Sequence, residues 1–165
     1  MFKNLFGKKQ EVVTEVELVS PLTGTAAALE SVDDPVFSQK MMGDGLAVQP
    51  AEGTVVAPVD GEIVQVFPTG HAVGIKAANG AEILIHIGLE TVSMKGEGFT
   101  AHVHEGDKVK KGDKLVSFDM SLVTERAKST VTPLIITNTD AMTIEQLATG
   151  EVEAGVTPFL KVTSK

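Results

Sequence analysis

Four histidines are the side chains of this sequence best suited to acid–base or nucleophilic chemistry at neutral pH, and they form two pairs. An imidazole changes its charge near pH 7 without help from its surroundings. The chain has no cysteine, which excludes a thiol nucleophile and a disulfide scaffold. The first pair is His71 with His86, and the second is His102 with His104. The chemistry open to the protein therefore depends on which pair the fold orients.

The first pair flanks a hairpin signal. Asn79-Gly80 between two apolar runs predicts a two-residue turn, which places Val73 opposite His86. His71 then lies on the same face as His86 and diagonal to it, at a backbone separation of roughly 7–8 Å. A slip of one residue would move one strand's side chains to the other face. The other residues expected on this face are Val73, Ile75, Leu84 and Gly88.

Two imidazoles that meet in apolar surroundings can carry a phosphoryl group. One neutral imidazole attacks a phosphoryl donor and holds the group as a phosphoramidate. The second imidazole donates a hydrogen bond or a positive charge to the phosphoryl oxygens. Apolar surroundings lower the pKa of both rings, which keeps the nucleophile unprotonated. The alternative is two unrelated histidines on a half-buried sheet.

The second pair, His102-Val103-His104, is expected on one face of a strand because side chains alternate with a period of two. Such a pair can bind zinc, but a zinc site also needs a third ligand and supporting hydrogen bonds. The sequence offers no convincing third ligand nearby. We therefore expect a solvated strand face beside Glu105.

Turn residues divide the chain into short strands, which predicts an all-β sandwich or barrel. Helical candidates are short and lie at 32–42, 121–128 and 143–149. The expected strands are Gly53–Val56, Gly61–Phe67, Ala72–Ala77, Glu82–Ile87, Gly98–His104, Lys114–Phe118, Thr132–Thr137 and Phe159–Thr163.

The composition is that of one acidic globular domain. The chain has 165 residues, of which 42% are hydrophobic, and 14 Lys and Arg against 22 Asp and Glu give a net charge of −8. That balance argues against nucleic-acid binding, which needs a basic surplus. No apolar run approaches the roughly 18–20 residues of a membrane span. The start of the chain lacks a secretory signal, so a cytoplasmic protein is expected.

The first residues differ from the rest in charge. Residues 1–9 contain three lysines and no acid, together with an apolar stripe of Met1, Phe2, Leu5 and Phe6. We expect residues 1–16 to form a flexible basic segment. Within it, residues 1–9 are either a small amphipathic anchor at an anionic membrane surface or a frayed tail.

Seven stretches, in conserved order and spacing over about residues 16–163, resemble the glucose-type enzyme IIA of the bacterial phosphoenolpyruvate-dependent sugar phosphotransferase system. The resemblance implies an antiparallel β-sandwich or barrel, the duplicated hybrid motif, over residues 17–165, with a few short helical turns. The stretches are SPLTG (20–24), DPVFSQKMMGDGLAVQP (34–50), APVDGEI (57–63), TGHAVGI (69–75), ILIHIGLETV (83–92), KGEGF (95–99) and KSTVTPLIITN (128–138).

The resemblance also implies roles for four residues. His86 corresponds to the histidine that accepts a phosphoryl group, and His71 corresponds to the supporting histidine that stabilises it. Thr69 falls where the family has a threonine that hydrogen-bonds to the second histidine and orients it. Glu90 stands where some relatives have Asp, so it keeps the charge but alters the reach of the carboxylate.

The partners implied by the resemblance are the histidine phosphocarrier protein HPr, an enzyme IIB domain of a sugar permease that receives the group on cysteine, and regulatory targets in some relatives. Acidic residues such as Asp44 and Glu90 suit a basic partner surface. No cofactor is required; in some relatives the two histidines bind zinc with a carboxylate from a partner. The apolar rim on which partners dock maps to Val36, Phe37, Met41, Met42, Phe67 and Leu84.

Two other protein classes share parts of this pattern. A lysostaphin-type zinc endopeptidase has a related β architecture and a ligand pair like His102-Val103-His104, but no partner motif is found here. A biotinyl or lipoyl carrier is suggested by the Gly-Asp turns within 103–118. Met94-Lys95 is followed by Gly, however, so the usual context of the modified lysine is missing.

Overall fold

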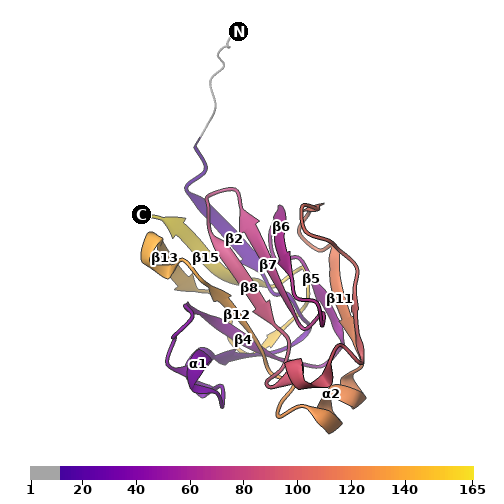
Figure 1. The fold of residues 1–165 in the computed structure, drawn as a ribbon. Coiled ribbons are helices and arrows are strands. Elements are labelled where there is room, and N and C mark those ends of the chain that lie inside the picture. Colours follow the sequence, from indigo (N-terminus) through magenta and orange to yellow (C-terminus); the bar gives the residue numbers. More distant parts are fainter. Residues whose placement is uncertain (1–11) are drawn as a thin grey trace.

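The computed structural model describes residues 12–165, and the basic segment 1–9 lies outside them (Figure 1). The described residues form three antiparallel sheets, as the all-β prediction requires. Strand β2 begins at Glu15, inside the segment 1–16 that was expected to be flexible. None of the helices in the described part of the chain is long and apolar enough to cross a membrane.

The largest sheet has eight strands, in the order β10-β6-β7-β8-β12-β4-β3-β14. Two smaller sheets of three strands each, β5-β11-β9 and β13-β15-β2, complete the fold. The bounds in the large sheet are Gly24–Ala28 (β3), Asp44–Pro50 (β4), Gly61–Val66 (β6), Ala72–Ala77 (β7), Glu82–His86 (β8), Lys108–Val109 (β10), Thr132–Ile136 (β12) and Glu151–Val152 (β14). Those in the small sheets are Glu15–Val19 (β2), Thr54–Val56 (β5), Phe99–Ala101 (β9), Lys114–Phe118 (β11), Met142–Gln146 (β13) and Pro158–Ser164 (β15).

The two α-helices of the described residues are short, and each begins where an aspartate provides a cap. Asp34 accepts a hydrogen bond from the Val36 N–H at the start of α1 (Pro35–Ser38), and Pro35 occupies the first helical position. Asp119 caps α2 (Met120–Arg126) in the same way. Both helices lie at the end of the molecule toward which β8 runs (Figure 1). Three 3-10 turns complete the set: η1 (Leu29–Ser31), η2 (Thr91–Met94) and η3 (Thr139–Ala141).

The large sheet is apolar on both faces. Alternate residues of β8, such as Ile83 and Ile85, enter the main core between the sheets. Leu84 points to the other face, where Ala72 and Ile135 form a second, smaller cluster with Phe37 of α1. His86 is two residues after Leu84 in β8, so its side chain lies on the same face as the smaller cluster.

The register of the β7–β8 hairpin differs from the prediction by one residue. Ala72, rather than Val73, lies opposite His86, because the loop has three residues instead of two. The Gly80 N–H donates to the Ala77 carbonyl, and Gly80 has a φ of +90°, which is the geometry of a three-residue loop with a left-handed last residue. Val73 and Ile75 therefore enter the main core, and of the predicted strand neighbours only Leu84 shares the face of His86.

Three local predictions are also corrected by the structure. Residues 143–149 are not helical: Met142 and Ile144 alternate with exposed residues in β13 and pair with β15. The helix expected at 32–42 is only the single turn α1, which ends before Lys40 at a φ of +58°. The strand expected over Gly98–His104 covers only Phe99–Ala101.

Candidate active site

His86 is the last residue of β8, and its ring is held by the backbone that follows. Gly88 turns the chain with a φ of +73°, and its carbonyl lies 2.8 Å from Nδ1 of His86. A carbonyl oxygen can only accept a hydrogen bond, so Nδ1 carries the proton in this arrangement. Nε2 of His86 then has a free lone pair, which is the form that a nucleophile needs.

His71 reaches the same place from a tight turn between β6 and β7. Gly70 donates its N–H to the Phe67 carbonyl and has a φ of +77°, and His71 follows directly. The Thr69 Oγ1 atom is hydrogen-bonded to Nδ1 of His71. The Ile87 N–H donates to the His71 carbonyl at 2.7 Å, which ties this turn to the end of β8. Because His71 lies outside the strand, strand alternation does not direct its side chain, and the pair survives the shift of register.

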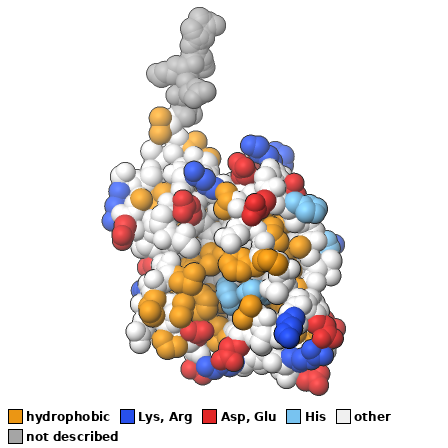
Figure 2. Space-filling view, viewed as in Figure 1, with side chains coloured by type: hydrophobic (Ala, Val, Ile, Leu, Met, Phe, Trp, Pro, Cys, Tyr) orange, Lys and Arg blue, Asp and Glu red, His pale blue; other side chains and the backbone are white. Residues whose placement is uncertain are grey.

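The two imidazoles meet, as the sequence predicted. Their ring centroids are 5.0 Å apart and their planes are inclined at 77°. Phe37 packs on His86 at a centroid distance of 5.2 Å, and Phe67 packs edge-on against His71 at 5.3 Å. In Figure 2 histidine surface lies within a band of hydrophobic side chains, with charged side chains outside the band. Within the described residues, each ring has Nδ1 hydrogen-bonded and Nε2 without a protein partner.

Burial sets the protonation state of both rings. His71 is only 3% exposed, and this burial, with the neighbouring His86, lowers its pKa to about 4. Burial also lowers the pKa of His86, against the opposing effects of the Gly88 carbonyl and the Asp34 carboxylate. Both imidazoles are therefore neutral at pH 7.

Asp34 is not among the site residues predicted from the sequence, although its charge acts on His86. The signal that could have singled it out is the Asp34-Pro35 pair, which is typical of a helix start and so places a carboxylate beside Phe37. Glu90, which was predicted, begins η2 with a φ of +61° and an exposed side chain. Of these two carboxylates, Asp34 is the one whose charge raises the pKa of His86.

The residues proposed for the apolar rim divide into exposed and buried groups. Met41 is 68% exposed, and Val36 and Met42 are also exposed. Phe67 is half-buried beside His71. Phe37 and Leu84 are buried in the smaller cluster, where they support His86 and leave little area for a partner to touch.

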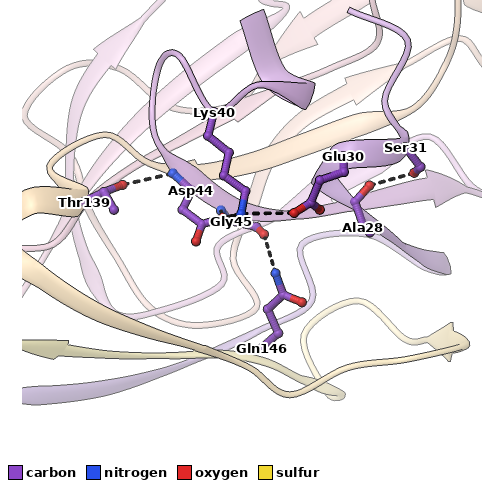
Figure 3. A network of polar contacts seen from close by, with 8 residues as sticks. All are labelled: Ala28, Glu30, Ser31, Lys40, Asp44, Gly45, Thr139 and Gln146. Atoms are coloured by element: carbon purple, nitrogen blue, oxygen red, sulfur yellow. Dashed lines mark hydrogen bonds and ion pairs between the residues drawn. The ribbon is translucent and has the colours of Figure 1, made fainter. Parts of the chain in front are cut away.

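A small charged network flanks this rim. Lys40 Nζ lies 3.1 Å from Oε2 of Glu30 and 3.4 Å from Oδ1 of Asp44. Asp44 is fixed further by the Thr139 hydroxyl, which accepts its N–H, and by the Gly45 N–H, which donates to its carboxylate (Figure 3). The hydrogen bond to Glu30 raises the pKa of Lys40. Asp44 is thus partly neutralised within the chain.

The second histidine pair has a different environment. Strand β9 ends at Ala101, so His102 and His104 lie beyond it in the following loop. His102 Nε2 is hydrogen-bonded to the Ser117 hydroxyl at 2.7 Å, and His104 is almost fully solvated. Over residues 12–165 no group of three or more His, Cys, Asp or Glu side chains is arranged to hold a metal ion.

Neither pair belongs to a complete zinc site formed by residues 12–165. His71 and His86 would supply two nitrogen ligands, whereas a structural zinc site takes four protein ligands and a catalytic one takes three. The described residues add no third ligand beside them.

The chain is similar to components of a sugar phosphotransferase system. Residues 16–142 match the family model of the phosphoenolpyruvate-dependent sugar phosphotransferase system, EIIA 1. The glucose-specific EIIA component of Bacillus cereus is 58% identical over 166 aligned residues, with all of both chains covered. That of Halalkalibacterium halodurans is 59% identical over 169 aligned residues, with 98% of each covered.

A solved structure agrees with these matches. The glucose permease IIA from Mycoplasma capricolum superimposes with a TM-score of 0.85 at 39% identity, covering 92% of this chain and 99% of that one. The fold, the family model and the relatives that align over their full length indicate the same family. The chain belongs to the EIIA 1 family of the phosphoenolpyruvate-dependent sugar phosphotransferase system.

Proposed function

We propose that His86 carries the phosphoryl group in the sugar phosphotransfer in which this family takes part. One observation supports this above all: two neutral imidazoles lie 5.0 Å apart in an apolar setting, each with Nδ1 held and Nε2 free. A family member is a phosphotransferase component, so a group that takes up and releases phosphoryl is required. His86 satisfies the requirement without a metal ion.

The reaction is a pair of displacements at phosphorus. The lone pair on Nε2 of His86 attacks the phosphorus of phosphohistidine in HPr, a new P–N bond forms, and the P–N bond to the HPr imidazole breaks. In the second step the cysteine thiolate of an enzyme IIB domain attacks the same phosphorus. The P–S bond forms, the P–N bond to His86 breaks, and the electron pair returns to Nε2.

His71 acts on the phosphoryl oxygens rather than on phosphorus. When the Thr69 hydroxyl donates to Nδ1 of His71, the proton of the neutral ring resides on Nε2. That N–H can donate to a phosphoryl oxygen bound on His86, where negative charge accumulates during transfer. Thr69 thus orients His71 as the Gly88 carbonyl orients His86.

Partners would approach over the exposed part of the apolar rim. Val36, Met41 and Met42 provide adaptable apolar contact, which suits one surface that meets HPr and enzyme IIB in turn. Asp34 adds negative charge near His86, and Glu90 adds an exposed carboxylate in the segment after β8; both would attract a basic partner surface. Zinc would enter this site only with a carboxylate from a bound regulatory protein. We expect these exchanges to take place in the cytoplasm. Membrane contact through residues 1–9 stays a prediction, because these residues lie outside the described part of the chain.

The test is incubation of the protein with phosphoenolpyruvate, enzyme I and HPr, followed by intact mass measurement. We expect an acid-labile gain of one phosphate in the wild-type protein and none in His86→Ala. The matched control is His102→Ala, which should gain the phosphate as the wild type does. A folded His86→Ala that still gains the acid-labile phosphate would refute the assignment.

A further inference from the structure

The turn after β8 contacts both histidines: the Gly88 carbonyl bonds to the ring of His86, and the backbone of His71 is bonded to Ile87. The Ile87 N–H donates to the His71 carbonyl at 2.7 Å. In a regular antiparallel pair its carbonyl would accept the return bond from His71, but within residues 12–165 that bond is not made. The Ile87 carbonyl accepts instead from the Thr91 hydroxyl at 2.6 Å. The backbone pairing with His71 is therefore incomplete at Ile87, and the Thr91 hydroxyl takes the place of the missing backbone donor.

Thr91 also packs directly on the glycine whose carbonyl orients His86. Thr91 is fully buried at the start of η2. A Cβ added to Gly88 would come within 2.7 Å of Thr91 Cγ2 and 2.8 Å of the Ser129 carbonyl oxygen. Thr91 and the Ser129 backbone thus leave no room for a side chain at Gly88, and the Leu89 N–H donates to the same Ser129 carbonyl at 2.9 Å.

We infer that Thr91 is a positioning residue: its hydroxyl fixes the Ile87 carbonyl and so aims the Gly88 carbonyl at Nδ1 of His86. The Ile87 and Gly88 carbonyls belong to successive peptides that are joined at the Cα of Gly88, so a shift of the first peptide displaces the second. Loss of the Gly88 bond would release the proton of His86 from Nδ1, and Nε2 would be protonated in part of the molecules. A protonated Nε2 cannot attack phosphorus.

This inference rests on the proposed function only for its kinetic consequence. The tautomer of His86 is a property of the unphosphorylated protein and can be measured without any phosphoryl donor. Thr91 is completely buried, so it does not contact a partner, and its replacement should change the rate of transfer rather than the affinity for phospho-HPr.

The experiment compares Thr91→Val, which removes the hydroxyl and keeps the shape, with Thr91→Ser, which keeps the hydroxyl. Ring nitrogen NMR should show His86 protonated at Nδ1 in the wild type and in Thr91→Ser, and a mixture of tautomers in Thr91→Val. We expect kcat for acceptance from phospho-HPr to fall by about tenfold in Thr91→Val, with KM within about twofold. If Thr91→Val does not fold, Thr91→Ala is compared with Thr91→Ser in the same way.

Thr132→Val is the matched control for loss of a buried hydroxyl. Thr132 is also fully buried, and its hydroxyl donates to a backbone carbonyl, that of Thr130, at 3.0 Å. It should lower stability without moving the tautomer of His86. An unchanged tautomer and unchanged kcat in Thr91→Val would overturn the inference. A shifted tautomer in a protein whose wild type never takes up phosphate would refute only the proposed function.

Discussion

The two histidine pairs of this protein show that closeness in sequence is a poor guide to chemistry. His102 and His104 are separated by one residue, yet they lie in a solvated loop and bond to different neighbours. His71 and His86 come from two strand ends and meet at a ring distance of 5.0 Å. What distinguishes the pair of His71 and His86 is that a backbone carbonyl and a threonine hold one nitrogen of each ring, while apolar side chains surround both rings.

The difference between the pairs is therefore one of support rather than of residue type. In an apolar setting an imidazole is neutral, and the partner of its held nitrogen decides whether the other nitrogen carries a lone pair, as in His86, or a proton, as in His71. A solvated imidazole is not restricted to one of these forms. This comparison is tested by making the same kind of substitution in each pair, at a histidine or at the hydroxyl group that bonds to it.

The largest difference between the two pairs is expected for His71→Gln. The variant should still accept a phosphoryl group on His86, because Nε2 of His86 remains free. Transfer onward to enzyme IIB should fall by about 100-fold, since the donor to the phosphoryl oxygens is changed. Rapid-quench kinetics with phosphorylated protein and purified enzyme IIB measures both steps. His102→Gln is the control, and an equal loss of both steps in His71→Gln would show that the two histidines do not have separate roles.

A smaller effect is expected from the hydroxyl groups that bond to the two pairs. Thr69→Val removes the partner of His71 Nδ1 and should slow onward transfer by about tenfold, because the N–H of His71 is no longer fixed on Nε2. Thr69→Ser should restore it. Ser117→Ala removes the corresponding bond to His102 and should leave transfer unchanged. A loss in Ser117→Ala as large as in Thr69→Val would break the distinction between the pairs.

Much of the fold can be predicted from short-range sequence signals, and the wrong predictions arise where contacts remote in sequence decide the structure. Turn residues separated the strands correctly from β5 to β8, because each Gly or Asp turn has a backbone requirement. The register of the β7–β8 hairpin was wrong because Asn79-Gly80 suits both two- and three-residue loops, and only the packing of Asn79 decides between them. Its side chain donates to the carbonyls of Thr14 and Val162, which are remote in sequence. Residues 143–149 were mistaken for a helix because their strand depends on pairing with β15.

The residues of the candidate site were easier to predict than their arrangement in space. His71 and His86 were found from residue type and the hairpin, and their meeting is confirmed. Phe37 and Leu84 were identified as rim residues, but the sequence does not show that η1 and α1 cover this face of the sheet and bury them. The Asp34-Pro35 pair predicts a helix start, but only the tertiary fold brings the Asp34 charge to His86. The Thr91 hydroxyl reaches a carbonyl four residues earlier through the turn at Gly88, a conformation that residue types alone do not specify.

Acid should destabilise the protein through the buried pair. The pKa of His71 is about 4 in the folded protein against 6.5 for an ordinary histidine, so the unfolded chain binds more protons between these values. The stability is therefore lost as the pH falls from about 6.5 toward 4. From pH 6.5 to 5.5 the free energy of unfolding should drop by about 1 kcal/mol on account of His71 alone. Urea unfolding of the wild type and of His71→Gln measures this difference, and identical pH profiles would contradict it.

The smallest effect is expected at His104, where the backbone rather than the imidazole matters. The ring is 91% exposed, and its Nδ1 lies 3.8 Å from Oδ2 of Asp107. The same carboxylate oxygen accepts the His104 N–H at 2.8 Å and so closes the turn. His104→Ala keeps that backbone bond and should change the free energy of unfolding by less than about 0.5 kcal/mol. Asp107→Ala removes it and should cost about 1 kcal/mol. The reverse order, by the same urea measurement, would show that the imidazole is held there as His86 is held by Gly88, and the contrast between the two pairs would fail.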